Sequence, residues 1–106
     1  MTTKIKTLAK TFSVASIIFL ASCAKTPVGC FTTDKGKTAK VNEEIQFNAS
    51  CSTDADTYLW DYGDGSTGSG SSTKHKYSTA KIYSVMLKVS NKSKSSSISQ
   101  DVTINP

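Results

Sequence analysis

The stretch of this 106-residue chain that is most informative about its fold is Trp60-Asp61-Tyr62-Gly63-Asp64-Gly65-Ser66. Side chains alternate between the two faces of a strand, so Trp60 and Tyr62 share one face with Tyr58. The strand is followed by Gly63-Asp64-Gly65, in which both glycines can adopt positive φ values and the aspartate can accept backbone hydrogen bonds. The stretch therefore predicts a strand with an aromatic inner face that ends in a tight turn.

Similar strand patterns lie on both sides of this stretch. Apolar and polar residues alternate in Ile45–Ala49, Ile82–Ser90 and Ile98–Ile104, and the polar residues Asn91–Lys94 fit a hairpin turn between the last two. Residues Gly65–Thr73 are all Gly, Ser or Thr and predict a mobile loop or a weak edge strand. Short strands divided by polar turns predict an all-β antiparallel sandwich of about seven strands. Its expected core contains Phe47, Trp60, Tyr83 and Leu87.

Three separated motifs resemble the PKD domain, an immunoglobulin-like module. The run at residues 60–65 resembles the family's aromatic, Asp, aromatic, Gly, Asp, Gly hallmark. His75-Lys76-Tyr77 resembles its His-x-Tyr, and residues 82–89 resemble its Tyr-x-Val-x-Leu-x-Val strand, although Lys81 stands where the family usually has glycine. The resemblance covers about residues 28–105. It implies an immunoglobulin-like sandwich that serves as a spacer or contacts proteins or polysaccharides.

The motif residues are expected to be structural. We expect Trp60 to pack in the core, and Asp61 and Asp64 to hydrogen-bond with the turn backbone. His75 is expected to pack or hydrogen-bond at a strand start. The residues given turn or core roles are Trp60, Asp61, Tyr62, Gly63, Asp64, Gly65, His75, Tyr77 and Tyr83.

A calcium site is the alternative role for the aspartates. Asp54, Asp56, Asp61 and Asp64 could supply carboxylate ligands, although their spacing matches no fixed ligand pattern. We otherwise expect no metal and no cofactor.

The N-terminal segment predicts export and lipid attachment. Lysines at positions 4, 6 and 10 precede Phe12–Ala21, an apolar stretch too short to span a membrane comfortably. Leu20-Ala21-Ser22-Cys23 resembles the lipobox of bacterial lipoproteins. The resemblance implies that residues 1–22 are removed and that Cys23 is acylated, for example with palmitate. The alternatives are an ordinary secretory signal with an accidental cysteine and, less favoured, a transmembrane helix.

The chain thus divides into a signal peptide (1–22), a lipidated N-terminus with a short tether (23–28) and one domain (29–106). Loss of the three leader lysines lowers the formal charge from +5 to about +2, so the basic character belongs mostly to the leader. The chain contains no arginine, the side chain best suited to phosphate and base contacts. We therefore expect no nucleic-acid partner.

Cys30 and Cys51 remain as a pair in a compartment where disulfides persist. We expect them to be bonded, which stabilises a small domain by roughly 3 kcal/mol in the chain-entropy model. Two free thiols are the alternative. A zinc site is disfavoured, because the cysteines lack a Cys-x-x-Cys spacing and the one histidine is distant in sequence.

Catalysis is not expected. The chain has one histidine, no Gly-x-Ser-x-Gly elbow and no phosphate-binding loop. Asp61 and Asp64 lie in one tight turn, which places them poorly for facing each other across a substrate.

These observations favour a non-catalytic protein of the bacterial cell envelope, attached to the membrane by lipid on Cys23, whose single domain mediates protein–protein or cell-surface interaction. Ala24 replaces the aspartate that favours inner-membrane retention, so the outer membrane is preferred, facing the periplasm or the surface. Two alternatives are a purely structural envelope role and polysaccharide binding. The latter needs an exposed aromatic surface from Phe31, Tyr58, Tyr62 and Tyr77, although strand alternation points Tyr58 and Tyr62 inward.

Overall fold

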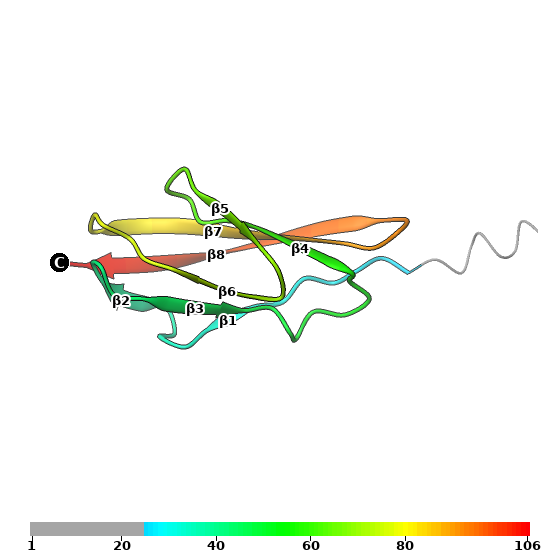
Figure 1. Cartoon of the computed structure of the whole chain (residues 1–106), viewed down its shortest axis with the longest axis horizontal. Helices are drawn as coiled ribbons and strands as arrows, with labels where there is room; N and C mark the ends of the chain where they lie inside the picture. Colours follow the sequence, from blue (N-terminus) through cyan, green and yellow to red (C-terminus); the bar gives the residue numbers. More distant parts are fainter. Residues whose placement is uncertain (1–24) are drawn as a thin grey trace, which may run out of the picture.

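The computed structural model describes residues 25–106, so the expected leader and Cys23 lie outside the described residues. The described chain forms eight strands in two facing sheets (Figure 1). They are β1 (Thr32–Thr33), β2 (Thr38–Lys40), β3 (Ile45–Asn48), β4 (Thr57–Asp61), β5 (Thr67–Ser69), β6 (Ser72–His75), β7 (Lys81–Ser90) and β8 (Ser95–Asn105). The all-β sandwich is confirmed, with eight strands where about seven were expected.

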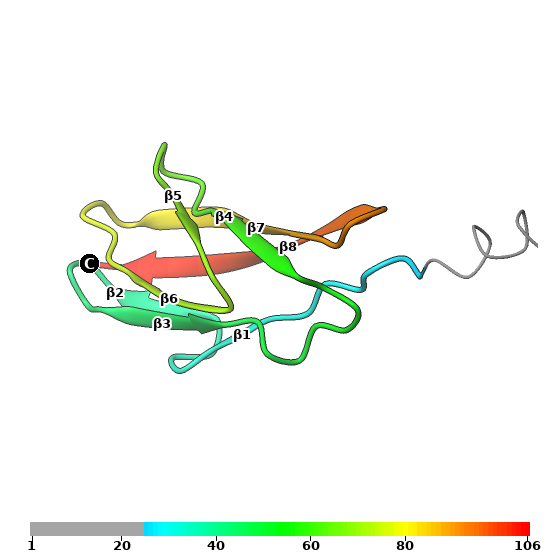
Figure 2. The same cartoon turned by 45° about the vertical axis from the view of Figure 1, so that its right-hand side comes forward.

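The smaller sheet has the strand order β1-β3-β6 and the larger has the order β2-β8-β7-β4-β5. β2 runs parallel to β8, and the other paired strands are antiparallel. Figure 2 shows the smaller sheet lying across one face of the larger. Within residues 25–106 there is no helix long and apolar enough to cross a membrane.

The longest pairing is the β7–β8 hairpin, which runs from Lys81 opposite Ile104 to Ser90 opposite Ser95. Its turn lies where the polar residues 91–94 predicted it. The side-chain oxygen Oδ1 of Asn91 accepts hydrogen bonds from the backbone N–H groups of Ser93 and Lys94, both at 2.9 Å. An asparagine that bonds its own following backbone is a typical turn residue, so this local chemistry fixes the hairpin register.

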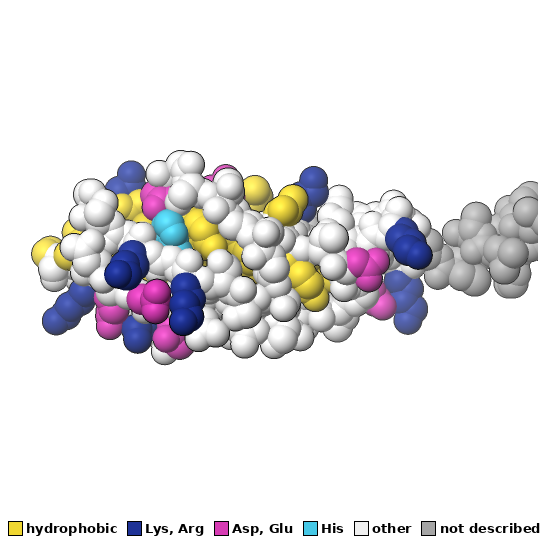
Figure 3. All heavy atoms as spheres, in the orientation of Figure 1, with side chains coloured by type: hydrophobic (Ala, Val, Ile, Leu, Met, Phe, Trp, Pro, Cys, Tyr) yellow, Lys and Arg dark blue, Asp and Glu magenta, His cyan; other side chains and the backbone are white. Residues whose placement is uncertain are grey.

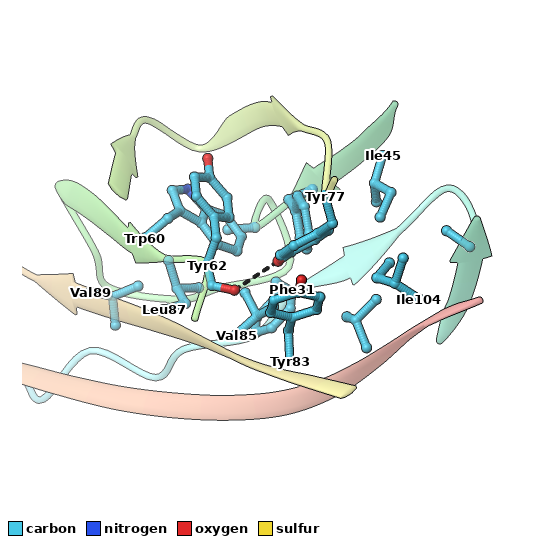
Figure 4. Close-up of a cluster of buried hydrophobic side chains, with 14 residues drawn as sticks. Phe31, Ile45, Trp60, Tyr62, Tyr77, Tyr83, Val85, Leu87, Val89 and Ile104 are labelled. Carbon is cyan, nitrogen blue, oxygen red and sulfur yellow. Dashed lines mark hydrogen bonds between the residues drawn. The ribbon is translucent and has the colours of Figure 1, made fainter. Parts of the chain in front are cut away.

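The core lies between the two sheets and combines six aromatic with eight aliphatic side chains (Figure 4). Trp60 is 1% exposed, its ring meets Phe31 edge-on at a centroid distance of 5.0 Å, and its Nε1–H donates to the carbonyl of Gly70 at 2.8 Å. The expected burial of four core residues is confirmed. The buried apolar residues are Phe31, Ala39, Ile45, Phe47, Ala49, Trp60, Tyr62, Tyr77, Tyr83, Val85, Leu87, Val89, Val102 and Ile104.

The Gly-Ser-Thr segment 65–73 contains β5 and the start of β6. Each of these strands ends the order of its sheet, so of the two structures expected here the edge strand is the one that forms. Tyr62 explains how a segment without apolar side chains is held, because its hydroxyl hydrogen-bonds to Thr73 at 2.8 Å.

Cys30 and Cys51 are bonded as expected, with an S–S distance of 1.90 Å and Cα atoms 5.4 Å apart. Beside the bond, Ser52 Oγ accepts from the N–H of Cys30 at 3.0 Å and donates to its carbonyl at 2.9 Å. The first described residues are therefore joined to the β3–β4 loop by one covalent bond and two hydrogen bonds.

Residues 25–28 were expected to be part of a short tether, and the structure instead places them against the domain. Pro27 is buried and its carbonyl accepts from Ser96 Oγ at 2.6 Å, while Val28 forms an antiparallel bridge with Thr53. Because Phe31 also accepts from the Gln100 amide at 2.8 Å, the segment runs alongside β8. In both Figure 1 and Figure 2 the described chain begins at one end of the sandwich, and the C-terminus lies at the opposite end.

Candidate functional site

Asp61 and Asp64 stabilise the turn that follows β4. Gly63 and Gly65 have φ values of 82° and 93°, the left-handed region expected of both. The N–H of Gly63 donates to Asp61 Oδ1 at 3.0 Å, and the N–H of Ser66 donates to Asp64 Oδ1 at 3.1 Å. Each carboxylate thus accepts a backbone N–H two residues further along the chain.

His75 closes this turn from the neighbouring sheet. Its ring stacks on Tyr62, with centroids 4.0 Å apart and planes 4° from parallel, and meets Tyr77 edge-on at 4.7 Å. Its Nε2 lies 2.7 Å from Asp64 Oδ2. Partial burial works to raise the pKa of Asp64, but the hydrogen bonds from Ser66 and His75 outweigh it and lower the pKa below its usual value.

Tyr77 ties the same cluster to the core. Its hydroxyl donates to the carbonyl of Tyr62 at 2.8 Å, a bond drawn in Figure 4. Burial raises the pKa of the Tyr77 phenol far above its usual value, and the nearby negative charge of Asp64 adds to that shift. The hydroxyl therefore stays protonated as a hydrogen-bond donor.

Ser66, His75 and Asp64 do not have the arrangement of a nucleophilic triad. The Ser66 hydroxyl lies 3.4 Å from His75 Nε2, the ring nitrogen that Asp64 also contacts, and it hydrogen-bonds to Asp64 Oδ1. A triad requires the serine and the acid on opposite nitrogens of the imidazole, so that the ring can accept a proton from one side while held from the other. This cluster is built to hold the turn.

Two alternatives from the sequence are not supported by the geometry. No group of three or more His, Cys, Asp or Glu side chains within residues 25–106 is placed to hold a metal ion, so the four calcium-candidate aspartates are not brought together. The aromatic sugar-binding surface is also wrong, since Phe31, Tyr62 and Tyr77 are 3%, 2% and 1% exposed and Tyr58 is only partly exposed. These rings are core residues because they occupy inward positions of a two-sheet sandwich.

The outer face of the larger sheet carries an exposed apolar pair that the sequence analysis did not single out. Leu59 on β4 is 52% exposed and Met86 on β7 is 39% exposed. Leu59 lies opposite Lys88, and Met86 lies opposite Asp61. The signal in the sequence was an apolar residue on the mostly polar outward phase of each strand, which on β7 also carries Ile82.

This pair forms the floor of a shallow hollow of about 330 Å³, which we call the Leu59–Met86 hollow. Strands β4, β5 and β7 supply the residues that line it, which are Leu59, Trp60, Asp61, Thr67, Gly68, Met86 and Lys88. The floor is aliphatic and the rim carries one acid, one lysine and one hydroxyl. On the face drawn in Figure 3, in contrast, apolar side chains are scattered among polar and charged ones.

The hollow lies next to an open sheet edge. β5 pairs with β4 and ends the strand order of the larger sheet. Its three residues, Thr67–Ser69, contain neither a charge nor a proline, two of the features that protect an edge strand from pairing with another chain, so its shortness is what limits such pairing to a few residues. An apolar hollow beside such an edge can accept an extended segment, whose backbone pairs with β5 while one side chain enters the hollow.

Comparisons with known proteins agree with this architecture. The family model described as PKD domain matches residues 26–105. The PKD1 domain of the Vibrio cholerae metalloprotease PrtV is 26% identical with a TM-score of 0.62, over 77% of this chain and 100% of that domain. The PKD1 domain of Vibrio anguillarum Epp is 20% identical with a TM-score of 0.64, over 77% of this chain and 96% of that domain, and shows the fold alone.

A further similar structure comes from work on the promiscuous specificity of carbohydrate-binding modules of the β-sandwich superfamily. It is 29% identical with a TM-score of 0.72, over 77% of this chain and 35% of that one. The present chain therefore spans about a third of the length of that structure.

Proposed function

Because this chain belongs to the PKD domain family, we propose that it is a non-catalytic binding protein of the bacterial cell envelope that contacts a protein partner. The likeness to PKD domains and to a structure from work on carbohydrate-binding modules supports a binding domain. The observation that carries the choice of a protein partner is the Leu59–Met86 hollow beside the open edge of β5.

The chemistry of the hollow suits an aliphatic side chain of a partner. Full burial of a leucine or methionine side chain contributes about 1.5–3 kcal/mol, so covering the exposed parts of Leu59 and Met86 contributes about 1 kcal/mol each. Lys88 on the rim can pair with an acid of the partner, whereas Asp61 Oδ1 already accepts the Gly63 N–H. The preferred ligand is an extended segment with an aliphatic residue followed or preceded by an acidic one.

Polysaccharide binding is the second candidate, and the 29% identity to the structure from work on carbohydrate-binding modules favours it. Sugar rings are commonly bound by stacking on exposed aromatic faces, and three of the four aromatic residues considered for that role are buried here. The hollow offers two aliphatic side chains and few polar groups, so a protein segment fits its floor better.

The proposed location rests on the leader. The lysines, the short apolar stretch and the Leu-Ala-Ser-Cys run support removal of residues 1–22 and acylation of Cys23. Ala24 after that cysteine supports the outer membrane over the inner, with the domain in the periplasm or on the surface. The disulfide fits a compartment outside the cytoplasm.

The test measures saturable binding of immobilised protein to envelope extract, followed by the same preparation on a polysaccharide array. Residues 23–106 are suitable as bait, because they include the core cluster of the described residues, from Phe31 to Ile104, and the buried Pro27. We expect the double variant Leu59→Ser/Met86→Ser to lose a partner that the wild type retains. Ile82→Ser is the matched control, since Ile82 is 62% exposed on the same strand as Met86 but does not line the hollow.

Equal loss of the partner by the control variant would contradict a site at the hollow. Saturable binding of a defined glycan without a protein partner would contradict the proposal and support polysaccharide binding. The absence of detectable binding in both assays would favour a purely structural role in the envelope.

A further inference from the structure

We propose that the end of the sandwich formed by Lys25 and the β7–β8 turn is a membrane-contact surface, which rests on anionic phospholipid headgroups and holds the domain upright. This inference deepens the proposed function and depends on the lipid at Cys23. We call the surface made by Lys25, Asp54, Asp56, Lys92 and Lys94 the anchor end. The opposite end, with the C-terminus, then faces away from the membrane (Figure 1).

The first described residue is already fixed to this end. The side-chain amide of Asn91 donates to the carbonyl of Lys25 at 2.9 Å and to the carbonyl of Asp54 at 3.0 Å. One side chain of the β7–β8 turn therefore joins the incoming chain to the β3–β4 loop. In Figure 2, as in Figure 1, the start of the described chain lies at the same end as this turn.

The segment that follows Lys25 cannot swing away as a free tether. Pro27 is buried and bonded to Ser96, the backbone of Val28 pairs with Thr53, and the Cys30–Cys51 bond comes two residues later. Residues 25–30 therefore move together with the sandwich. The link between lipid and domain is therefore the stretch of chain from Cys23 to Lys25.

That chain is very short. Only Ala24 separates Cys23 from Lys25, so the two Cα atoms of Cys23 and Lys25 are at most roughly 7 Å apart. The polar headgroup region of one leaflet is about 5–7 Å thick, and an acylated cysteine sits at its boundary with the hydrocarbon. The β7–β8 turn, one hydrogen bond from Lys25, is therefore kept close to the headgroup region.

Charge favours this contact over repulsion. Lys25, Lys92 and Lys94 are exposed at the anchor end, together with the exposed acids Asp54 and Asp56. The group carries one net positive charge, and such a charge acts over the Debye length of about 8 Å at physiological salt. A lysine near an anionic leaflet contributes about 1 kcal/mol, so the two turn lysines attract the headgroups and the two acids offset part of that attraction.

The test uses the thiol of Cys23 as a chemical handle. With Cys30 and Cys51 bonded, it is the one free thiol among the three cysteines of residues 23–106, and it can be coupled to a maleimide lipid. The coupled protein is bound to vesicles of phosphatidylethanolamine and phosphatidylglycerol. Each lysine is then labelled with an amine-reactive ester and quantified by peptide mass spectrometry, with uncoupled protein as reference.

We expect Lys92 and Lys94 to be labelled several-fold more slowly on vesicles than in free protein, and Lys76 and Lys81 at the opposite end to be labelled at an unchanged rate. A control variant carries a Gly-Ser linker of roughly 15 Å r.m.s. length between Ala24 and Lys25, and it should lose the protection. Equal labelling of both ends, or protection that survives the linker, would overturn the inference.

Failure of this inference and failure of lipid anchoring give different results. The vesicle experiment attaches lipid chemically and tests only how the domain sits. Acylation in cells is read separately from the mass of the N-terminal peptide beginning at Cys23. An acylated peptide with unprotected turn lysines would sink the membrane-contact surface alone, and an unmodified peptide would sink the anchoring on which it rests.

Discussion

Removal of the Cys30–Cys51 bond is the perturbation whose effect the structure predicts most directly. The bond closes a loop with a sequence separation of 21, and the chain-entropy model gives a stabilisation of about 3 kcal/mol for a loop of this length. Replacing both cysteines by serine leaves the core intact, because Cys51 is exposed and Cys30 is only partly buried. The loss therefore measures the cross-link itself.

The assay is urea unfolding of residues 23–106 with and without the double substitution Cys30→Ser/Cys51→Ser. A loss of about 3 kcal/mol corresponds to a fall in Tm of roughly 12–24 °C for a domain of this size. Ser52→Ala is the control, since it removes only the two hydrogen bonds to Cys30 and should cost about 1–2 kcal/mol. A loss below about 1 kcal/mol in the double variant would refute the reasoning, because closing this loop would then cost far less entropy than the chain-entropy model gives.

Three further predictions concern the turn and its support. Gly63→Ala should lower the free energy of unfolding by more than about 2 kcal/mol, because φ is positive and the added Cβ would lie 2.5 Å from a β7 carbonyl oxygen. Gly65→Ala should lower it by about 1 kcal/mol, because φ is also positive there but the added Cβ would enter open space. Urea unfolding measures both changes. The lowered folded-state pKa of Asp64 means that its carboxylate stabilises the fold above about pH 4 and loses this contribution as pH falls through the folded pKa. Asp64→Asn should flatten that part of the acid dependence of the urea midpoint, and an unchanged slope would count against the pairing. Tyr77→Phe should destabilise by about 1–2 kcal/mol through loss of the bond to the Tyr62 carbonyl, seen as a lower Tm with unchanged far-UV circular dichroism.

Alternation explains why much of the fold could be predicted from the sequence. Tyr83, Val85, Leu87 and Val89 recur at every second position, and all four are buried on β7. The polar turn at 91–94 and the paired glycines at 63 and 65 also lie where local chemistry indicated. These features depend on neighbours in sequence, which a linear pattern records.

Long-range contacts account for what the sequence did not predict. Nothing in residues 25–28 indicated attachment to the domain, because their partners Asn91 and Ser96 lie more than 60 positions away. β5 and β6 lack an apolar stripe, and their pairing depends on Tyr62 and Trp60 reaching across to Thr73 and Gly70.

The candidate site was missed for a related reason. Leu59 and Met86 are apolar residues on the mostly polar outward phases of two separate strands, and only the pairing of β4 with β7 brings them to one surface. Conversely, the aromatic residues considered for sugar binding were placed inward by the same alternation that predicted the core.

Site-specific photo-crosslinking in intact bacteria tests most directly the claim that this domain binds a protein through the Leu59–Met86 hollow. A photoreactive amino acid is placed at Thr67 on the rim of the hollow or, as control, at Ser97, which is exposed on β8 and does not line the hollow. We expect a discrete protein adduct from position 67 and none from position 97. Adducts of equal yield from both positions, or none from position 67 while the protein is correctly exported, would contradict it.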